Sequence, residues 1–309
     1  MRVLAFDTSN YTTSVALYDG TEGHNISRLL DVEQGSLGLR QSDALFAHVK
    51  RLPELADRLF SDFGHRDICA VGASTRPRAV EGSYMPCFLA GKTQAEVIAA
   101  ALGVPFYPFS HQQGHIAASC WASGRMDLMD RPHLAWHLSG GTTELLLVEP
   151  EGLNVAAKKI GGTTDISAGQ LIDRTGKLLD LPFPSGKYLD ELSKAATGKD
   201  LFRVKVQDMS FSLSGVENKV MAYHKGKDAE TAAYALRCVI GAIISATKNA
   251  LKLYPDYEVV FAGGVASNSL LREKCKGLPA VFCPPCFATD NAMGTAILTW
   301  RAQYGTGCL

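Results

Sequence analysis

A strand, a short polar turn and a returning strand occur twice in this chain, and this repeat constrains the fold more than any other feature. The first copy spans residues 2–18, with small polar residues at its tip over 8–12. The second copy spans 133–148, with its tip at 139–143, and a third strand follows over 153–160. Two copies of one unit predict an internal duplication whose second half begins near residue 131.

Helices and strands alternate through the rest of the chain. Apolar residues at three- and four-residue spacing predict helices over about 42–60, where Pro53 introduces a kink or a break, and over 87–102, 165–179, 189–196, 213–223 and 229–253. Short apolar runs predict strands over 69–74, 104–109, 257–262 and 281–282, and Asp290 is expected to cap a last helix through Trp300. With 309 residues, the chain is predicted to be an α/β protein of two lobes, 1–130 and 131–309.

The composition indicates a globular protein without a strong pull toward polyanions. Lys plus Arg and Asp plus Glu both number 31, and 46% of the residues are apolar, so a nucleic-acid partner would need a local basic patch or a second subunit. We expect a cytoplasmic protein without membrane contact, because no signal-peptide pattern and no apolar run of roughly 18 residues is present. Cys283 and Cys286 have the spacing of a redox pair or half a zinc site, but structural or incidental roles are favoured.

His111 and His115 are candidate metal ligands. They follow the predicted strand 104–109 and open a helix, on which residues four apart share a face and can point at one ion. Imidazole binds zinc, iron, nickel and copper, and α/β folds place ligands at the carboxyl ends of strands. On spacing alone, the alternative of two histidines that cap the helix or fill the core stays open.

Small residues at three strand ends suggest a nucleotide site. Gly140 and Gly141 allow a ligand to approach the backbone and offer N–H groups to an anion, although a plain hairpin with a glycine bend explains them equally well. Gly263 and Gly264 could form a flat shelf before a helix N-terminus, and they do not belong to the GxGxxG pattern of a Rossmann dinucleotide site. The first tip adds the candidate phosphate-binding residues Asp7, Ser9 and Thr12.

Two such tips and a Gly-Gly shelf in this order resemble the plan of the actin-like ATPase folds, and the motifs together resemble the TsaD family. These are the tRNA N6-adenosine threonylcarbamoyltransferases, once called O-sialoglycoprotein endopeptidases. The resemblance covers nearly the whole chain through seven blocks in the family's order: 111–115 for H-x-E-G-H, 139–144 for S-G-G-H-T-E, 164–174 for D-D-A-A-G-E-A-F-D-K, 183–186 for Y-P-G-G, 209–216 for F-S-F-S-G-L, 262–268 for A-G-G-V-A-A-N, and 288–293 for C-T-D-N-A-A.

The resemblance implies a fold, a site and a reaction. The fold is the duplicated actin-like ATPase (ASKHA, ribonuclease H-like) fold, with an adenine nucleotide (ATP, AMP or threonylcarbamoyl adenylate) in the cleft. One divalent ion, iron or zinc, would be held by His111, His115 and Asp290, and Asp173 would bind a ribose or threonyl hydroxyl. The threonylcarbamoyl group would pass to N6 of a tRNA adenosine. Substrate contacts are implied for Leu138, Ser139, Gly140, Gly141, Thr142, Asp173, Gly186 and Asn268.

The resemblance also implies partners. The family works with a second actin-like subunit and a small ATPase, and tRNA is its substrate. On this chain, candidate tRNA-binding residues are Lys158, Lys159, Arg203 and Lys205.

Several family residues are replaced in this chain. The glutamate between the histidines is Gln113, the hairpin histidine is Thr142, both acids are absent from the N-terminal segment 10–14, and the Gly-Pro-Gly loop is replaced by 75–82. We interpret the chain as a divergent paralogue that keeps the fold, the ion and the nucleotide. The transferase ranks first, and a non-catalytic or altered-substrate paralogue is the alternative. A metalloprotease ranks last, because HExxH is absent, and an actin-like kinase would leave the histidines without a role.

Overall fold

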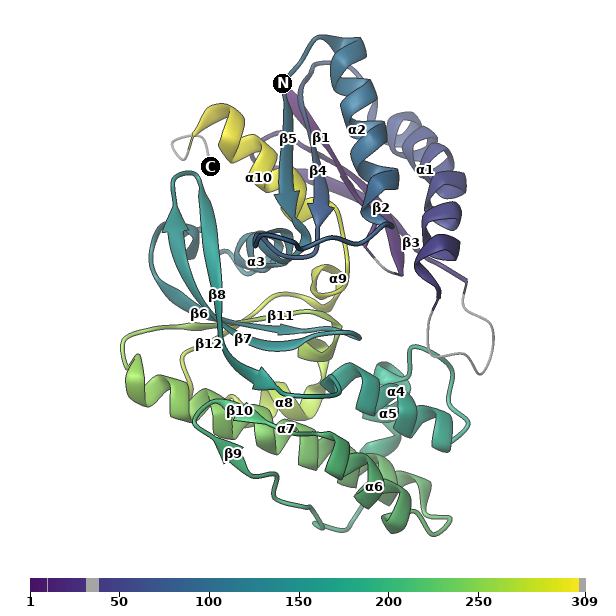
Figure 1. Cartoon of the computed structure of the whole chain (residues 1–309), viewed down its shortest axis with the longest axis vertical. Coiled ribbons are helices and arrows are strands. Elements are labelled where there is room, and N and C mark those ends of the chain that lie inside the picture. Colours follow the sequence, from purple (N-terminus) through teal and green to yellow (C-terminus); the bar gives the residue numbers. More distant parts are fainter. Residues whose placement is uncertain (10, 32–38, 306–309) are drawn as a thin grey trace.

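Two α/β lobes, each built on one mixed sheet, make up the computed structural model, which describes residues 1–9, 11–31 and 39–305 (Figure 1). Asn10, part of the segment that lacks the family's acids, lies outside the described residues. The first sheet has the order β3-β2-β1-β4-β5. Its strands are β1 (Arg2–Asp7), β2 (Thr12–Tyr18), β3 (Gly23–Leu29), β4 (Ile68–Arg76) and β5 (Phe106–Ser110).

The second sheet repeats the topology of the first. Its order is β12-β11-β6-β7-β8-β10-β9, so β8-β7-β6-β11-β12 corresponds position by position to the first sheet. In both, three antiparallel strands are followed by two parallel ones. Its strands are β6 (His133–Leu138), β7 (Thr143–Glu151), β8 (Asn154–Thr163), β9 (Val206–Gln207), β10 (Ser210–Phe211), β11 (Val259–Ala262) and β12 (Ala280–Phe282). The predicted duplication is confirmed by this shared strand order.

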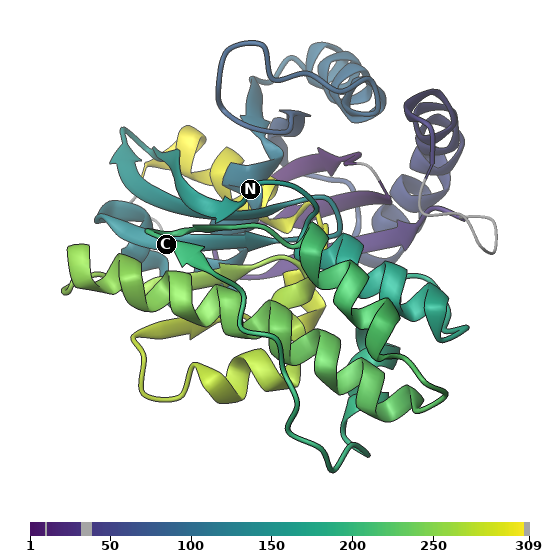
Figure 2. The same cartoon turned by 60° about the horizontal axis from the view of Figure 1, so that its bottom comes forward.

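Helices cover both faces of each sheet. Helices α1 and α2 pack on one face of the first sheet, α4 to α8 lie on the outer side of the second, and α3 and α10 lie between the sheets (Figures 1 and 2). Their bounds are α1 (Gln41–Phe63), α2 (Phe88–Leu102), α3 (His111–Ala122), α4 (Ala168–Leu178), α5 (Gly186–Ser193), α6 (Ser214–Tyr223), α7 (Asp228–Leu253), α8 (Ser269–Lys274), α9 (Pro285–Ala288) and α10 (Met293–Tyr304), with short 3₁₀ helices at η1 (Met126–Asp130) and η2 (Gly264–Ser267).

The central strands are buried on both faces, as is typical of strands between two helical layers. In β6, Leu134, Trp136 and Leu138 enter the core under α7, while Ala135 belongs to the core that α3 and α10 share with both sheets. Successive side chains on a strand point to opposite faces. His137 therefore lies on the α3 side of the second sheet.

Three local predictions differ from the structure. Helix α1 continues through Pro53, because its buried face, including Leu52 and Leu55, packs on the first sheet on both sides of the proline. The segment 263–268 does not open a helix directly: it first forms η2, and α8 begins after its cap Asn268. The expected Asp290 cap is wrong: the N-cap residue of α10 is Ala292, and the side chain that accepts from the first N–H of the helix is that of Asn291. The lobe boundary near residue 131 stays a prediction, and α10 returns from the second half to pack on the first sheet.

Helix α7 corrects the expectation that no segment approaches the length of a membrane span. Among the described helices, it is long and apolar enough to qualify, with a mean hydropathy of 1.3. However, 67% of its qualifying window is buried inside the molecule. It lies along the second sheet as a core helix (Figure 2).

Candidate functional site

The start of α3 places two histidines side by side between the lobes. Ser110 caps the helix: its hydroxyl accepts from Gln113 N, and the Gln113 side chain accepts from Ser110 N. Such a capping box fixes the first helical turn. His111 and His115 then lie on one face, with their Nε2 atoms 2.9 Å apart. The predicted shared face of these histidines is confirmed.

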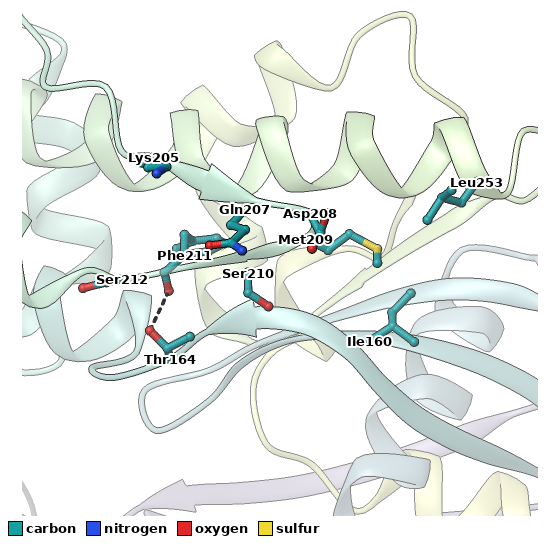
Figure 3. A pocket seen from close by; sticks show the side chains of 10 residues that line it. All are labelled: Ile160, Thr164, Lys205, Gln207, Asp208, Met209, Ser210, Phe211, Ser212 and Leu253. Atoms are coloured by element: carbon teal, nitrogen blue, oxygen red, sulfur yellow. Dashed lines mark hydrogen bonds between the residues drawn. The ribbon is translucent and has the colours of Figure 1, made fainter.

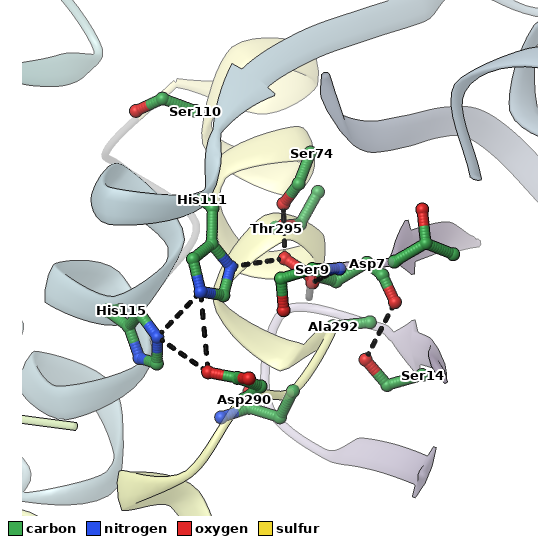
Figure 4. Close-up of polar contacts among 12 residues, drawn as sticks. Asp7, Ser9, Ser14, Ser74, Ser110, His111, His115, Asp290, Ala292 and Thr295 are labelled. Atoms are coloured by element: carbon green, nitrogen blue, oxygen red, sulfur yellow. Dashed lines mark hydrogen bonds and ion pairs between the residues drawn. The ribbon is translucent and has the colours of Figure 1, made fainter. Parts of the chain in front are cut away.

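Asp290 joins the histidines from the far end of the chain. Its Oδ1 lies 3.2 Å from His115 Nε2 and 3.4 Å from His111 Nε2 (Figure 4). Helices α3 and α10 cross closely enough to bring it there, since a Cβ on Gly294 would lie 1.8 Å from Gly114 O. The three residues that the sequence proposed as metal ligands are therefore brought together.

Asp7 orients His111 from the opposite side of the ring. His111 Nδ1 donates to Asp7 Oδ2 over 2.8 Å, and Ser74 Oγ donates to the same oxygen over 2.5 Å. The backbone N–H of Ser9 donates to Oδ1. Metal-binding histidines commonly donate their second N–H to a carboxylate, which fixes the ring and its tautomer. Asp7, predicted as a phosphate-binding residue, thus presents His111 Nε2 to the cluster.

The cluster carries opposing charges that are mostly shielded from solvent, since the side chains of His111 and Asp290 are 12% and 21% exposed. Burial alone would lower the pKa of His111, but the carboxylates of Asp7 and Asp290 outweigh it and raise this pKa to about 10. Burial would likewise raise the pKa of Asp290, but hydrogen bonds from His111 and His115 hold it well below its usual range. The two carboxylates therefore stabilise a positive charge at this position. A divalent cation bound among the same side chains would supply that charge.

His137 was missed by the sequence analysis. Its ring nitrogens and those of His111 and His115 supply ligand atoms that all lie within 4.8 Å of one another. Both ring nitrogens of His137 are buried and have no hydrogen-bond partner among the described residues. The available signal was a histidine next to the end of a mostly apolar strand that leads into the Gly-Gly tip. Three imidazoles and a carboxylate suit zinc or iron, so the donor set fits the expected ion.

The second hairpin tip is open to solvent. Gly140 and Gly141 are exposed, and a Cβ added to either would meet nothing within 4 Å. Thr142 N donates to Ser139 Oγ over 3.1 Å, which holds the turn. The tip can therefore accept a ligand against its backbone.

The Gly-Gly shelf packs directly against that hairpin. Gly263 has φ +93°, and a Cβ there would lie 2.3 Å from Leu138 O, so only glycine fits. Gly264 opens η2 with more space around it. The Asn268 side chain accepts from Leu271 N as the cap of α8 and donates to Asp190 Oδ1.

The loop before α5 lies opposite the first tip. The rings of Tyr11 and Phe183 meet edge to face with centroids 5.9 Å apart. Asp173 Oδ1 accepts from Ser185 N over 2.8 Å, directly before Gly186, and burial raises the pKa of Asp173. Of the remaining first-tip residues, Ser9 and Thr12 are buried.

Two departures from the family pattern have structural explanations. The Gln113 amide nitrogen donates to Val155 O over 2.8 Å, so this side chain serves the helix cap and β8. Arg78, in the replaced loop, forms a two-point ion pair with Glu144 of β7 at 2.9 and 3.0 Å, and Lys159 joins it at 3.3 Å. This network ties the loop of the first lobe to the second sheet.

A separate hollow of about 610 Å³ lies between β8, the β9–β10 hairpin and the end of α7 (Figure 3). Its lining contains none of the histidines or Asp290, and its charged residues are Lys205 and Asp208, both exposed. It is not the candidate site.

Cys283, one of the two cysteines with redox or zinc-site spacing, is buried, and its sulfur accepts from Ser119 Oγ. The side chain of Cys286 lies outside the described residues.

Comparison with known sequences gives consistent matches over most of the chain. Residues 34–297 match the family described as TsaD, tRNA N6-adenosine threonylcarbamoyltransferase. A protein of that name from Carboxydothermus hydrogenoformans is 30% identical over 308 residues, covering 94% of this chain and 89% of the relative. Another from Streptococcus pneumoniae is 30% identical over 290 residues, covering 88% and 82%.

Solved structures match the fold at low sequence identity. Full-length HypF in its phosphate- and nucleotide-bound form has a TM-score of 0.62 at 12% identity, covering 98% of this chain and 47% of HypF. The activator of the 2-hydroxyisocaproyl-CoA dehydratase from Clostridium difficile with bound ADPNP has a TM-score of 0.54 at 13% identity, covering 98% and 95%. With the repeated strand order, these matches confirm the duplicated actin-like ATPase fold.

Proposed function

Because the chain belongs to the TsaD family of tRNA N6-adenosine threonylcarbamoyltransferases, we propose that it transfers a threonylcarbamoyl group from its adenylate to N6 of a tRNA adenosine, with one bound divalent metal ion. The observation that carries this proposal is the meeting of His111, His115 and Asp290 between the lobes. Asp290 is 175 residues from His115 in sequence, yet 3.2 Å from it in space.

The ion, zinc or iron, would be held by His111 Nε2, His115 Nε2 and Asp290. When bound, it would supply Lewis acidity to oxygens of the phosphate and carbamoyl groups. Asp7 accepts from His111 Nδ1, so that His111 would bind the ion through Nε2 once this nitrogen gives up its proton. A bound ion would explain why two carboxylates, Asp7 and Asp290, flank His111 between the lobes.

The two exposed glycines would stabilise negative charge on the substrate. In the reaction, the N6 amine attacks the carbamoyl carbon, the bond from that carbon to the phosphate oxygen breaks, AMP leaves, and the amine loses a proton. The backbone N–H groups of Gly140 and Gly141 are suited to the oxygen on which charge develops. Neither residue has a side chain that would block this approach.

The remaining predicted contacts would bind the adenylate. Gly263 and Gly264 offer a shelf for its adenosine, and Asn268 fixes the adjacent start of α8. Asp173, with one oxygen already accepting from Ser185 N, has a second oxygen for a ribose or threonyl hydroxyl. The contacts proposed for the ligand are Leu138 through its backbone, Ser139, Gly140, Gly141, Thr142, Asp173, Gly186, Gly263, Gly264 and Asn268, with Ser9 and Thr12 near the phosphate.

The tRNA surface and the protein partners are further parts of the proposal. The candidate tRNA residues Lys158, Arg203 and Lys205 are exposed, and Lys159 is about half exposed while it pairs with Glu144. Since the net charge is zero, we propose that a second actin-like subunit and a small ATPase complete tRNA binding, and that the assembly works in the cytoplasm.

The non-catalytic alternative is weaker than the transferase. It rested on the acids lost from the N-terminal segment 10–14 and on Gln113, and Gln113 has a capping role that requires no acid. The retained cluster of His111, His115 and Asp290 is costly to keep without a ligand, because it buries opposing charges.

A transfer assay tests the proposal. Metal-loaded protein, threonylcarbamoyl adenylate and unmodified tRNA are combined with and without the candidate partner subunits, and modified adenosine is measured by mass spectrometry. We expect product from the wild type, and a loss of at least 100-fold for Asp290→Asn. Asp256→Asn, an exposed aspartate before β11, is the control and should keep wild-type activity. Absence of product under every condition would reject the transferase.

A further inference from the structure

We propose that His137 is a further protein ligand of the ion, so that three imidazoles and one carboxylate hold it. This inference rests on the metal site of the proposed function and adds a residue from a different element. His111 and His115 come from α3 and Asp290 from the segment before α10, whereas His137 comes from β6 of the second sheet. The ion would then join both lobes.

The position of the His137 ring supports the assignment. Its centroid lies 4.8 Å from that of His115 and 6.2 Å from that of His111. The ligand atoms of the three rings lie within 4.8 Å of one another. Metal–nitrogen bonds of about 2.0–2.1 Å allow donor atoms on opposite sides of an ion to be roughly 4 Å apart. In a tetrahedral site these bonds place donor atoms roughly 3.4 Å apart, so the rings would have to rotate toward one another to hold one ion.

The ring nitrogens of His137 make no hydrogen bond to any described residue. The side chain is 93% buried. Buried polar groups without a partner are rare in native proteins and require an explanation. A bound ion gives one of the two nitrogens a partner.

The nearest acceptor on the sheet is already engaged. Glu144 lies directly opposite His137 in the β6–β7 ladder, and both side chains point to the same face. However, the Glu144 carboxylate pairs with Arg78 and Lys159. The carboxylate is thus held by cations, and His137 faces the histidine cluster.

The strand also prevents His137 from turning toward solvent. Its backbone pairs with Glu144 on one side and with Ala262 of β11 on the other, in the interior of the second sheet. A ligand on such a strand is held in place by the sheet itself. Three nitrogens and one oxygen favour zinc or cobalt(II) over magnesium or calcium, which prefer oxygen ligands.

The structure supplies a matched control on the same strand. His133 lies four residues before His137, on the same face of β6, is fully buried, and also has an Nε2 without a partner among the described residues. It does not belong to the cluster of three histidines. His133→Gln therefore reports the effect of altering a buried histidine of β6 away from the site.

The test measures cobalt(II) and zinc binding to the full chain by competition with a chromophoric chelator, together with the visible spectrum of bound cobalt. We expect His137→Leu and His137→Gln to weaken both metals by tenfold or more and to change the cobalt spectrum. His133→Gln should keep wild-type affinity and spectrum. Wild-type affinity and an unchanged spectrum in both His137 variants would overturn the inference.

A second measurement needs no variant and covers the case in which both variants fail to fold. X-ray absorption at the metal edge of the zinc-loaded wild type should show three imidazoles, and two would overturn the proposal. The variant His111→Ala/His115→Ala distinguishes an error in the proposed metal site from an error in the role of His137. If it binds metal as the wild type does, the proposed metal site itself is wrong. If it loses metal while the His137 variants do not, only the role of His137 is wrong.

Discussion

Gln113 stands between the two proposed ligands in sequence, but its amide makes hydrogen bonds at both ends. Its oxygen accepts from Ser110, and its nitrogen donates to Val155 O. In Gln113→Glu the carboxylate cannot donate, so it would face that carbonyl oxygen without a hydrogen. We expect a loss of about 1–3 kcal/mol in the free energy of unfolding, measured by urea denaturation, while metal affinity changes little.

The matched control lies in α4. Gln170 forms the same capping box with Ser167, but it is exposed, and among the described residues only its oxygen makes a side-chain hydrogen bond. Gln170→Glu should keep the cap and leave the stability within about 0.5 kcal/mol. Equal losses in the two variants would show that the Val155 hydrogen bond is not the cause.

His48 gives a prediction for pH. This buried residue of α1 shares a hydrogen bond with Thr13, and burial lowers its pKa to about 4, below the ordinary 6.5. Between these values the unfolded chain binds the proton that the folded chain rejects, so stability falls as pH drops from 6.5 toward 4. His48 alone should cost about 2 kcal/mol between pH 7.5 and pH 5.

The measurement compares urea denaturation at the two pH values. His48→Gln should reduce the difference by about that amount, because glutamine does not titrate. His65→Gln, an exposed histidine just after α1, should leave it unchanged. A pH difference that is the same in all three proteins would exclude His48 as its source.

Sequence reasoning found some residues of the site and missed others for identifiable reasons. His111 and His115 were identifiable because helical spacing fixes their common face. Asp290 was assigned from family resemblance, while local pattern alone assigned it to a helix cap. His137 was missed, because the alternation of β6 shows which face it occupies only after the packing of α3 on that face is known. Asp7 was assigned to phosphate because its contact with His111 spans 104 residues.

At the level of elements, the crossing of α3 and α10 positions the proposed ligands. Gly114 and Gly294 meet there, and a Cβ on Gly294 would lie 1.8 Å from Gly114 O. Gly294→Ala must therefore separate the helices and move Asp290 away from His115. We expect a loss of about 3 kcal/mol in the free energy of unfolding, with weaker metal binding, measured by urea denaturation and chelator competition.

Gly241→Ala is the control for this substitution. Gly241 is an exposed glycine inside α7, and a Cβ there would meet nothing within 4 Å. The added methyl should stabilise the protein by about 0.5–1 kcal/mol through helix propensity. Destabilisation by both variants would show that a general intolerance of helix changes, rather than the crossing, is responsible.

The repeated strand–turn–strand unit made the main elements predictable, but the exact boundaries of the elements were harder to predict. The doubled strand–turn–strand pattern correctly predicted the hairpins β1–β2 and β6–β7 at the centre of the two sheets, but β3 was not predicted. No pattern in the sequence indicated α9 or the β9–β10 hairpin, which are short and depend on contacts with distant segments. Pro53 did not break α1, because packing on the sheet outweighs the local preference.

At the scale of the whole molecule, one core joins the two halves. Val3 and Ala5 of the first sheet, Ala135 and Val260 of the second, and Ile297 of α10 belong to the same buried cluster. If one sheet unfolded, the apolar residues that the other sheet contributes to this cluster would be exposed to solvent. We therefore predict a single calorimetric unfolding transition with equal calorimetric and van't Hoff enthalpies, whereas two separable transitions would show that the lobes unfold independently.

The central claim is that one ion lies between His111, His115 and Asp290, where the two lobes meet. Anomalous diffraction from crystals of the metal-loaded protein, collected at the absorption edge of the metal, tests it most directly. We predict one strong peak within about 2.0–2.2 Å of His111 Nε2, His115 Nε2 and a carboxylate oxygen of Asp290. No peak at this position, or a metal bound only elsewhere on the chain, would contradict the account.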